Sequence, residues 1–436
     1  MHVRKGRSVS RSNRLGRVAA LAWFLVAGAF AQEPPPSKTG DERYAKMPEE
    51  AVPYRRFVQP YERFFLTSLE YNGPGREYPE PENVSEVRLG FLGPILDSPD
   101  KQLGTQMLRG ARMALEEANA RGGGYRGKPF VLVEHNDQAL WGASSNEFVK
   151  LAYDDKVWAM LGSIDGSSTH IALRVTLKSE VPIVNTGSTD PTLTETRIPW
   201  IFRCVPDDRQ QSYALADVVF KRERLTRVAG LRSSDRYGRV GIAEFRDAAR
   251  RLGHPLVLEL LYNIGEKDFR PLLERLKAAR VEGVVIWGDA REAGLILLQM
   301  RQLGLQAKVF GADRVATPEL LAVAGPAAEG LIATYPYDPT RNDPVFGQFV
   351  LNFQQRFGEP PSPFAAYAYD GMNLLVSAIQ KAGLNRARIR DALAALKEYD
   401  GVTGRIVFDL THNNVAPLAL ATVNRGRFLF RPAPAR

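Results

Sequence analysis

Cysteine and histidine are scarce in this chain of 436 residues, which contains one cysteine, Cys204, and five histidines. A single cysteine cannot form a disulfide within the chain, so the fold must rest on a large hydrophobic core. No two histidines lie one helical turn apart, which is the spacing that a compact metal site favours. We therefore expect His135 and His170 to be structural, and we predict no metal and no cofactor.

Motifs typical of α/β enzymes are also missing. A dinucleotide-binding enzyme carries G-x-G-x-x-G after its first strand, but residues 90–94 at that place read GFLGP. No G-x-S-x-G nucleophile motif occurs either. We therefore expect a protein without enzymatic activity.

Excess positive charge is confined to the start of the chain. The formal net charge is +9. Removing the six basic residues before position 18 lowers this value to +3, and no long run of Lys and Arg remains. Nucleic-acid binding is therefore not expected. The six residues are Arg4, Lys5, Arg7, Arg11, Arg14 and Arg17.

An apolar run at residues 18–30 follows the basic start, and Ala29-Phe30-Ala31 forms a small-x-small cleavage sequence. These three parts are typical of a secretory signal peptide, and the run is short for a membrane span. We predict that residues 1–31 are a cleaved signal peptide and that the protein is periplasmic or otherwise exported. An uncleaved amino-terminal anchor is the alternative. No cysteine stands at the cleavage point, so a lipoprotein tether is not expected.

Residues 32–86 are rich in Pro, Glu, Tyr and Arg and lack apolar periodicity. This composition predicts an extended Pro-rich arm rather than a domain. Its many aromatic residues favour packing of the middle of the arm against the globular body.

From residue 87 onward, short apolar runs alternate with amphipathic helical segments. This alternation predicts an α/β fold with two doubly wound parallel sheets covered by helices on both faces. Expected strands of the first series are 87–92, 130–134, 158–161, 181–184 and 201–204. Expected strands of the second series are 228–231, 256–262, 284–287, 309–310 and 331–335. Helices at 345–357, 364–382 and 389–396 and a strand pair, 404–408 with 416–423, are expected to close the chain.

Two stretches rich in Gly, Ser and Thr follow expected strands of the first series: residues 162–169 (GSIDGSST) and 182–191 (PIVNTGSTDP). Open α/β sheets bind ligands at the carboxyl ends of their strands. Glycines let backbone N–H groups approach a ligand, and hydroxyl groups add short donors and acceptors. Neither stretch contains a nucleophile with a base, so the pattern favours binding rather than reaction.

Several motifs in unbroken order resemble the periplasmic ligand-binding proteins of branched-chain amino acid ABC importers. The resemblance covers residues 87–425 and leaves the arm outside. The motifs are 90–94 (GFLGP), 110–119 (GARMALEEAN), 162–169, 182–191, 237–238 (YG), 265–269 (GEKDF), 310–313 (FGAD), 328–331 (AEGL) and 369–371 (YDG).

The resemblance implies two α/β lobes, joined by three crossings of the chain, that close over a small amino acid-like or amide-like ligand and deliver it to the membrane permease of an ABC importer. Lobe one would comprise residues 87–205 and 336–407, and lobe two residues 206–335 and 408–430. The crossings are expected near 205–208, 334–336 and 408–410.

The same resemblance implies a ligand site. Gly166, Ser167 and Ser168 would bind the carboxylate of an amino acid. The carbonyl of Gly187 and the Thr189 hydroxyl would bind its ammonium group, with Ser188 between them. Tyr237 and Asp313 would reach the ligand from lobe two, and Asp289 is expected at a strand end facing the cleft.

Plainer interpretations of these residues stay open. Ser167, Ser168 and Thr169 are also typical helix caps, and Asp190-Pro191 is typical of a helix start. Tyr237 fits an ordinary turn, and Asp313 could pair with Arg314.

The chain also departs from the family. Leu103 stands where relatives place an aromatic residue, and the cysteine pair of some relatives is absent. Aspartates 165, 190, 289 and 313 make the expected cleft acidic, which favours a cationic or amide ligand unless arginines or helix ends satisfy them.

Two other uses of the same fold are compatible with the sequence. An exported sensor would report ligand occupancy to a membrane receptor. A scaffold with a degenerate cleft would bind no small molecule, although the presence of Gly187, Thr189 and Tyr237 argues against it.

Overall fold

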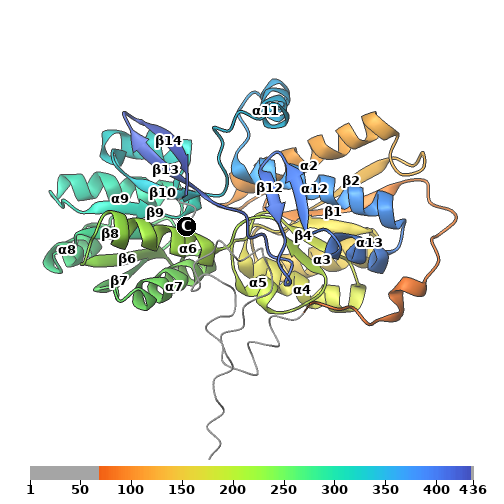
Figure 1. The fold of residues 1–436 in the computed structure, drawn as a ribbon, viewed down its shortest axis with the longest axis horizontal. Helices are drawn as coiled ribbons and strands as arrows, with labels where there is room; N and C mark the ends of the chain where they lie inside the picture. Colours follow the sequence, from red (N-terminus) through yellow and green to blue (C-terminus); the bar gives the residue numbers. More distant parts are fainter. Residues whose placement is uncertain (1–67, 434–436) are drawn as a thin grey trace, which may run out of the picture. The chain divides into compact units, whose positions relative to one another are not determined.

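The computed structural model describes residues 68–433. It contains two large, separate sheets, and the strands of the first sheet precede those of the second along the chain (Figure 1). Residues 1–67, which include the predicted signal peptide and most of the arm, lie outside the described residues. Among the helices of residues 68–433, none is long and apolar enough to span a membrane.

The first sheet is five-stranded, parallel throughout, and ordered β2-β1-β3-β4-β5. Its central strand β3 is buried at every position, as expected of a parallel strand covered on both faces. Ala159 and Leu161 face one core cluster and Met160 faces another, because successive side chains point to opposite sides of a sheet. The strands are β1 (Val87–Gly93), β2 (Phe130–Asn136), β3 (Ala159–Gly162), β4 (Ile183–Asn185) and β5 (Ile201–Arg203).

The second sheet is seven-stranded and ordered β14-β13-β10-β9-β8-β6-β7. Strands β6 to β10 are parallel, whereas β13 and β14 add an antiparallel edge. The strands are β6 (Val228–Ser233), β7 (Leu258–Tyr262), β8 (Gly283–Trp287), β9 (Lys308–Gly311), β10 (Ile332–Tyr335), β13 (Ala419–Asn424) and β14 (Arg427–Pro432).

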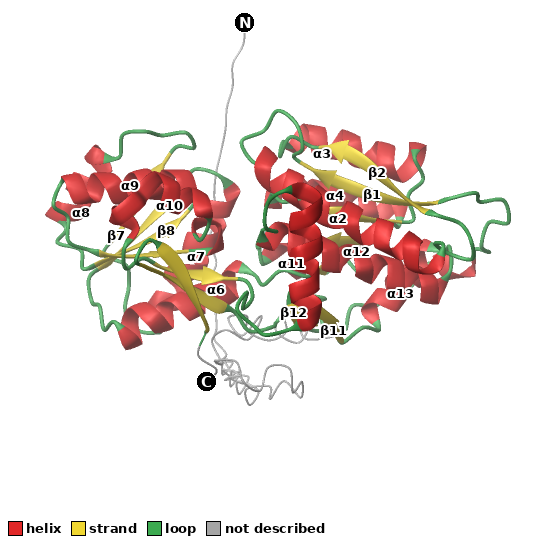
Figure 2. Ribbon diagram, turned by 90° about the horizontal axis from the view of Figure 1, so that it is seen from above, coloured by secondary structure: helices red, strands yellow, loops and turns green. Residues whose placement is uncertain are grey.

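Helices cover both faces of each sheet (Figure 2). Around the first sheet lie α2 (Lys101–Gly122), α3 (Trp141–Val149), α4 (Gly166–Ser179), α5 (Thr192–Glu195), α12 (Pro363–Ala382) and α13 (Arg386–Ala394). Around the second lie α6 (Asp208–Ala216), α7 (Arg236–Arg251), α8 (Arg270–Ala278), α9 (Ala290–Gln302) and α10 (Pro318–Ala324). We call each sheet with its helices a lobe.

Helix α12 returns from the carboxyl-terminal block to pack along α2 of the first lobe (Figure 1). The contact is close because α2 carries Gly110 there: a Cβ at this position would lie 2.0 Å from the carbonyl oxygen of Ala365. Any larger residue would push the helices apart, so this glycine sets the distance between segments 250 residues apart in sequence.

The chain passes between the lobes three times, as the expected fold class requires. The passages follow β5, β10 and the short strand β12 (Gly404–Val407), and they occupy residues 204–207, 336–343 and 408–418. The second passage leads into α11 (Pro344–Phe357).

The carboxyl-terminal strands differ from expectation. We predicted that 404–408 and 416–423 would pair, but β12 pairs with β11 (Glu398–Gly401), and β13 pairs with β10 and β14. The prediction was wrong because β11 and β14 are partly exposed edge strands with weak apolar signals. Helix α6 was also missed, because its first turn buries polar and charged side chains.

The described end of the arm, residues 68–86, packs against the first lobe. The Tyr71 ring meets Trp200 edge-on with centroids 4.8 Å apart, and its hydroxyl donates to Glu180 over 2.6 Å. Arg76 forms a two-pronged ion pair with Asp391 of α13. Glu180 and Trp200 precede β4 and β5 in the chain, and Asp391 lies on α13. The contacts therefore hold the arm near the amino ends of β4 and β5.

We expect Tyr71→Ala to lower the free energy of unfolding by about 3 kcal/mol, because it removes a buried ring and a hydrogen bond. Ligand affinity should not change, since the ring touches neither strand carboxyl ends nor the second lobe. Urea unfolding and calorimetry would measure the two quantities. Tyr78→Ala is the matched control, because Tyr78 is 61% exposed. An equal loss of stability in both variants would contradict the docking of the arm.

Candidate functional site

The first predicted loop follows β3 and enters α4, which begins at Gly166. Asp165 caps this helix, accepting a hydrogen bond from the Ser168 backbone N–H at 2.8 Å. The capping role therefore belongs to Asp165, and the idea that Ser167 or Ser168 caps the helix is wrong. The Ser168 hydroxyl is buried and makes no hydrogen bond among the described residues.

The second predicted loop follows β4 and is held by Asn185. The Asn185 side chain accepts from the Ser188 N–H at 3.0 Å and donates to the Ser163 carbonyl at 2.8 Å. Gly187 then lies against the first loop, where a Cβ would meet the Cα of Ile164 at 2.9 Å. The two loops predicted from the sequence are thus in contact, at the carboxyl edge of the first sheet.

Residues of the second lobe form a compact group. The Tyr237 hydroxyl, on the first turn of α7, donates to Asp313 over 2.7 Å. The Arg314 guanidinium stacks on the Tyr237 ring at 4.1 Å from its centroid. Burial, reinforced by the Asp313 charge, raises the pKa of Tyr237 well above its usual range. Tyr237 is therefore a neutral hydrogen-bond donor, and Asp313 pairs with it rather than with Arg314.

Arg314 instead pairs with Asp289, at 3.5 Å, and donates to the Ile164 carbonyl of the first lobe at 3.3 Å. Burial raises the pKa of Asp289 to about 7, although Arg314 opposes the shift. Burial lowers the pKa of Arg314, but Asp289 and Asp100 outweigh this and raise it, so the guanidinium stays charged.

A second arginine neutralises Asp190 across the cleft. Arg236 of α7 donates to the Asp190 carboxylate at 2.6 Å, and His170 lies 3.6 Å from it. Burial alone would raise the pKa of Asp190, but His170, Arg236 and Thr192 hold it below its usual range. Asp190 also accepts from the Thr192 N–H at the start of α5, as the helix-start interpretation predicted.

The remaining histidine expected to be structural is engaged as well. His135 contacts Glu147 at 2.5 Å and Asp155 at 2.9 Å. Within residues 68–433, no group of three or more His, Cys, Asp or Glu side chains is arranged to hold a metal ion.

Asp208 is a candidate site residue that the sequence reasoning missed. It is 1% exposed at the start of α6, and its backbone N–H donates to the Thr189 carbonyl at 2.8 Å. Neither its carboxylate oxygens nor the Thr189 hydroxyl makes a hydrogen bond of normal geometry with any described residue. The doublet Asp207-Asp208, a few residues after the buried strand β5, was the available signal.

The electrostatics of Asp208 reflect its burial. Burial raises the pKa of Asp208 well above its usual range. The nearby Thr189 hydroxyl lowers it, whereas Asp313 and Asp190 raise it further. Asp208 therefore lies within electrostatic reach of predicted site residues of both lobes.

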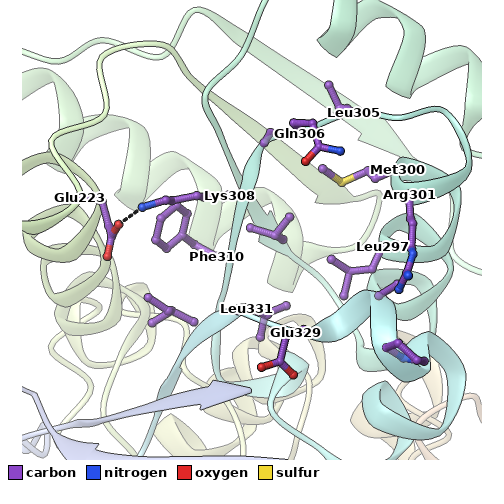
Figure 3. Close-up of a pocket in the computed structure, with 16 residues that line it drawn as sticks. Glu223, Leu297, Met300, Arg301, Leu305, Gln306, Lys308, Phe310, Glu329 and Leu331 are labelled. Carbon is purple, nitrogen blue, oxygen red and sulfur yellow. Dashed lines mark hydrogen bonds and ion pairs between the residues drawn. The ribbon is translucent and has the colours of Figure 1, made fainter. Parts of the chain in front are cut away.

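A cavity of about 510 Å³ lies elsewhere, at the amino ends of β9 and β10 in the second lobe (Figure 3). Leu297, Phe310 and Leu331 line it, with a Glu223–Lys308 ion pair at one side. None of the predicted site residues lines this cavity. Because ligands of open α/β sheets bind at the carboxyl ends of strands, we place the functional site at the two loops instead.

Comparison with known proteins is consistent with this geometry. The sequence profile described as periplasmic binding protein matches residues 86–427. The chain belongs to the periplasmic binding protein family. Members of this family bind solutes for transport, and the match excludes the arm, as the motifs predicted.

Relatives of this periplasmic binding protein include amino-acid binders. It is 33% identical over 337 residues to "Leu/Ile/Val-binding protein homolog 2" of Brucella abortus (strain 2308), covering 75% of this chain and 87% of the relative. It is 29% identical to the leucine-, isoleucine-, valine-, threonine- and alanine-binding protein of Pseudomonas aeruginosa, covering 74% and 86%.

Solved structures agree with the fold. A branched-chain amino acid transporter substrate-binding protein of Streptococcus pneumoniae, in complex with isoleucine, gives a TM-score of 0.73 at 25% identity, covering 80% of this chain and 99% of that one. A leucine-binding protein of Thermotoga maritima gives 0.73 at 24% identity, covering 79% and 97%, which supports the fold alone.

We expect the contribution of Asp208 to the free energy of unfolding to fall as pH rises above about 4, where the unfolded chain loses its aspartate protons. The folded protein keeps a proton on Asp208 that the unfolded chain releases, and the state that binds more protons is favoured at low pH. Asp208→Asn should reduce the loss of stability between pH 5 and pH 7.5 by at least about 1.4 kcal/mol, the free energy of one proton over one pH unit. Urea unfolding at both pH values measures this.

Asp207→Asn is the matched control. Asp207 pairs with the buried Arg203 at 3.1 Å, so its loss should destabilise the protein at both pH values. A pH dependence unchanged by Asp208→Asn would show that Asp208 is charged in the folded protein.

Proposed function

We propose that this periplasmic binding protein captures a small amino acid-like solute between its lobes and delivers it to the permease of an ABC importer. The observation that carries the proposal is a group of buried polar atoms without partners where the two predicted loops and α6 meet. They are the Ser168 and Thr189 hydroxyls and the Asp208 carboxyl group.

Buried polar groups in folded proteins are normally hydrogen-bonded, because an unsatisfied group costs about 1–3 kcal/mol. A local concentration of such groups therefore favours a ligand that supplies the missing bonds. The loops offer both kinds of partner that an amino acid needs. Backbone N–H groups at the start of α4 suit a carboxylate, and the Thr189 hydroxyl and Asp208 carboxylate suit an ammonium group.

The roles follow from these placements. Gly166, Ser167 and Ser168 bind the ligand carboxylate, and Gly187 and Thr189 bind its ammonium group together with Asp208. Charge also favours a ligand with no net charge: Asp190 is neutralised by Arg236, and Asp289 by Arg314. The two ion pairs offset the negative charge of Asp190 and Asp289, so the cleft does not disfavour ordinary amino acids.

The second lobe completes the site through Tyr237 and Asp313. Arg236 and Arg314 already reach carboxylate and carbonyl acceptors of the first lobe. A ligand that touches both lobes adds to these contacts and shifts the population toward the closed arrangement. The closed arrangement is then what the membrane permease recognises.

Export to the periplasm is part of the proposal. The basic start, apolar run and cleavage sequence of residues 1–31 support it, and the relatives named for leucine, isoleucine and valine binding support an amino acid as the ligand.

A thermal-shift screen against amino acids, amides and small carboxylates, followed by calorimetry, tests the proposal. A ligand at a hundred times its Kd should add about 2.7 kcal/mol of stability. Thr189→Val should weaken amino-acid binding at least tenfold, because it removes a hydrogen bond to a charged group, about 1.5–3 kcal/mol.

Thr196→Val is the matched control, since the Thr196 hydroxyl donates to the Leu193 carbonyl at 2.8 Å instead of facing the predicted site. Equal affinities in the wild-type protein and Thr189→Val would remove Thr189 from the site. Absence of any amino-acid ligand would overturn the proposed function.

A further inference from the structure

Arg314 occupies an unusual position for a buried arginine. It is 6% exposed, yet its two polar contacts, Asp289 at 3.5 Å and the Ile164 carbonyl at 3.3 Å, are both long. Charge-assisted hydrogen bonds are typically about 2.7–2.9 Å, and a guanidinium carries five N–H donors. The Tyr237 ring therefore holds the guanidinium in place, but these two acceptors do not satisfy all of its N–H donors.

Two aspartates that interact electrostatically with Arg314 differ from the other aspartates that stand at helix starts. Asp165, Asp207, Asp235 and Asp343 occupy N-cap positions, and each accepts a hydrogen bond from its own helix. Asp289 and Asp100 occupy the N-cap positions of α9 and α2, but neither side chain caps its helix.

Asp289 and Asp100 both interact electrostatically with Arg314, one from each lobe. The Asp289 side chain keeps 31% of its surface exposed, so it remains accessible to a ligand.

This group adjoins the predicted ligand loops. The Ile164 carbonyl that Arg314 contacts belongs to the loop after β3, and Ile164 in turn lies against Gly187 and near Met107 of α2. A ligand held at Gly187 and Thr189 would thus extend its side chain toward Arg314. Leu103, where relatives place an aromatic residue, is in the first turn of the same helix α2.

The chemistry of the group selects one kind of side chain. An anionic side chain would meet Arg314 but also Asp289 and Asp100, and a cationic side chain would meet the guanidinium. An apolar side chain would leave the Arg314 N–H donors that Asp289 and the Ile164 carbonyl do not satisfy without a partner, which is costly in a buried site. A primary carboxamide suits both the guanidinium and the carboxylates, because its carbonyl accepts from an arginine while its two N–H groups donate to carboxylates.

We propose that Arg314 and Asp289 form the side-chain subsite of the cleft and that this subsite takes a primary carboxamide. The inference rests on the proposed function, since it assumes an amino acid held at the two loops. It narrows the ligand to amino acids with an amide side chain, of which asparagine and glutamine are the test compounds.

Calorimetry of the purified chain with matched ligands tests the subsite. Asparagine, leucine and aspartate have side chains of nearly the same shape, and glutamine and glutamate form a second matched pair. The tighter-binding amide should bind at least tenfold more strongly than its apolar or anionic partner, because a site built for hydrogen bonds discriminates strongly against analogues that lack them.

Arg314→Met separates the role of the guanidinium group from that of the aliphatic part of the side chain. Methionine preserves apolar packing on Tyr237 but removes every N–H donor, so the preference for the amide should fall to about threefold or less. Arg232→Met is the matched control: Arg232 pairs with Glu259 at 3.3 Å within the second lobe, so the amide preference should persist. Circular dichroism of both variants checks that they fold, and the wild-type comparison stands without them.

The outcomes distinguish the two proposals. Wild-type affinity for leucine equal to or above that for asparagine would overturn the carboxamide subsite and leave amino-acid binding intact. Tighter binding of aspartate, glutamate or lysine would overturn it in the same way. Failure of every amino acid to bind would overturn the proposed function and the subsite together.

Discussion

The buried guanidinium of Arg203, at the end of β5, organises the junction between the lobes. It is fully buried and binds the Asp190 carbonyl, the Asp207 carboxylate at 3.1 Å and the Asn413 side-chain oxygen at 2.7 Å. One side chain thereby ties the loop after β4 to the first and third passages of the chain between the lobes. The position of Thr189, and of Asp208 beside it, depends on this junction, because each is the chain neighbour of a residue that Arg203 binds.

Pairing of charges across the cleft leaves a defined set of groups for a ligand. Arg236 neutralises Asp190, and Arg314 stays close to Asp289 without saturating it. The Asp208 carboxyl group is buried at this junction and makes no hydrogen bond of normal geometry with any residue of 68–433. Burial favours its protonated form when the site is empty, and an ammonium group nearby would favour the charged form, which is a strong acceptor. Binding and the stability of the closed arrangement are therefore linked through the same few side chains.

Most of the fold was predictable because both sheets are built from short, fully buried apolar strands such as β3 and β8. Helix α6 escaped prediction because its first turn buries Asp208, Arg209 and Gln211, and its apolar burial begins only at Tyr213. These polar residues are satisfied by distant partners: Arg209 pairs with Glu244 of α7, and Gln211 accepts from Thr334. Such an interface carries no periodic signal, since each partner comes from another part of the chain.

The sequence by itself determined the α/β class, the two series of strands and the two loops that follow β3 and β4, because these depend on local periodicity and on glycine and hydroxyl residues at strand ends. Only the tertiary structure decided which acids are paired. Asp165 caps a helix, Asp190 binds Arg236 and Asp313 binds Tyr237, whereas Asp208 has no such bond. The reason is physical: burial and partner distance set the state of a carboxylate, and both depend on residues brought together from different strands and lobes.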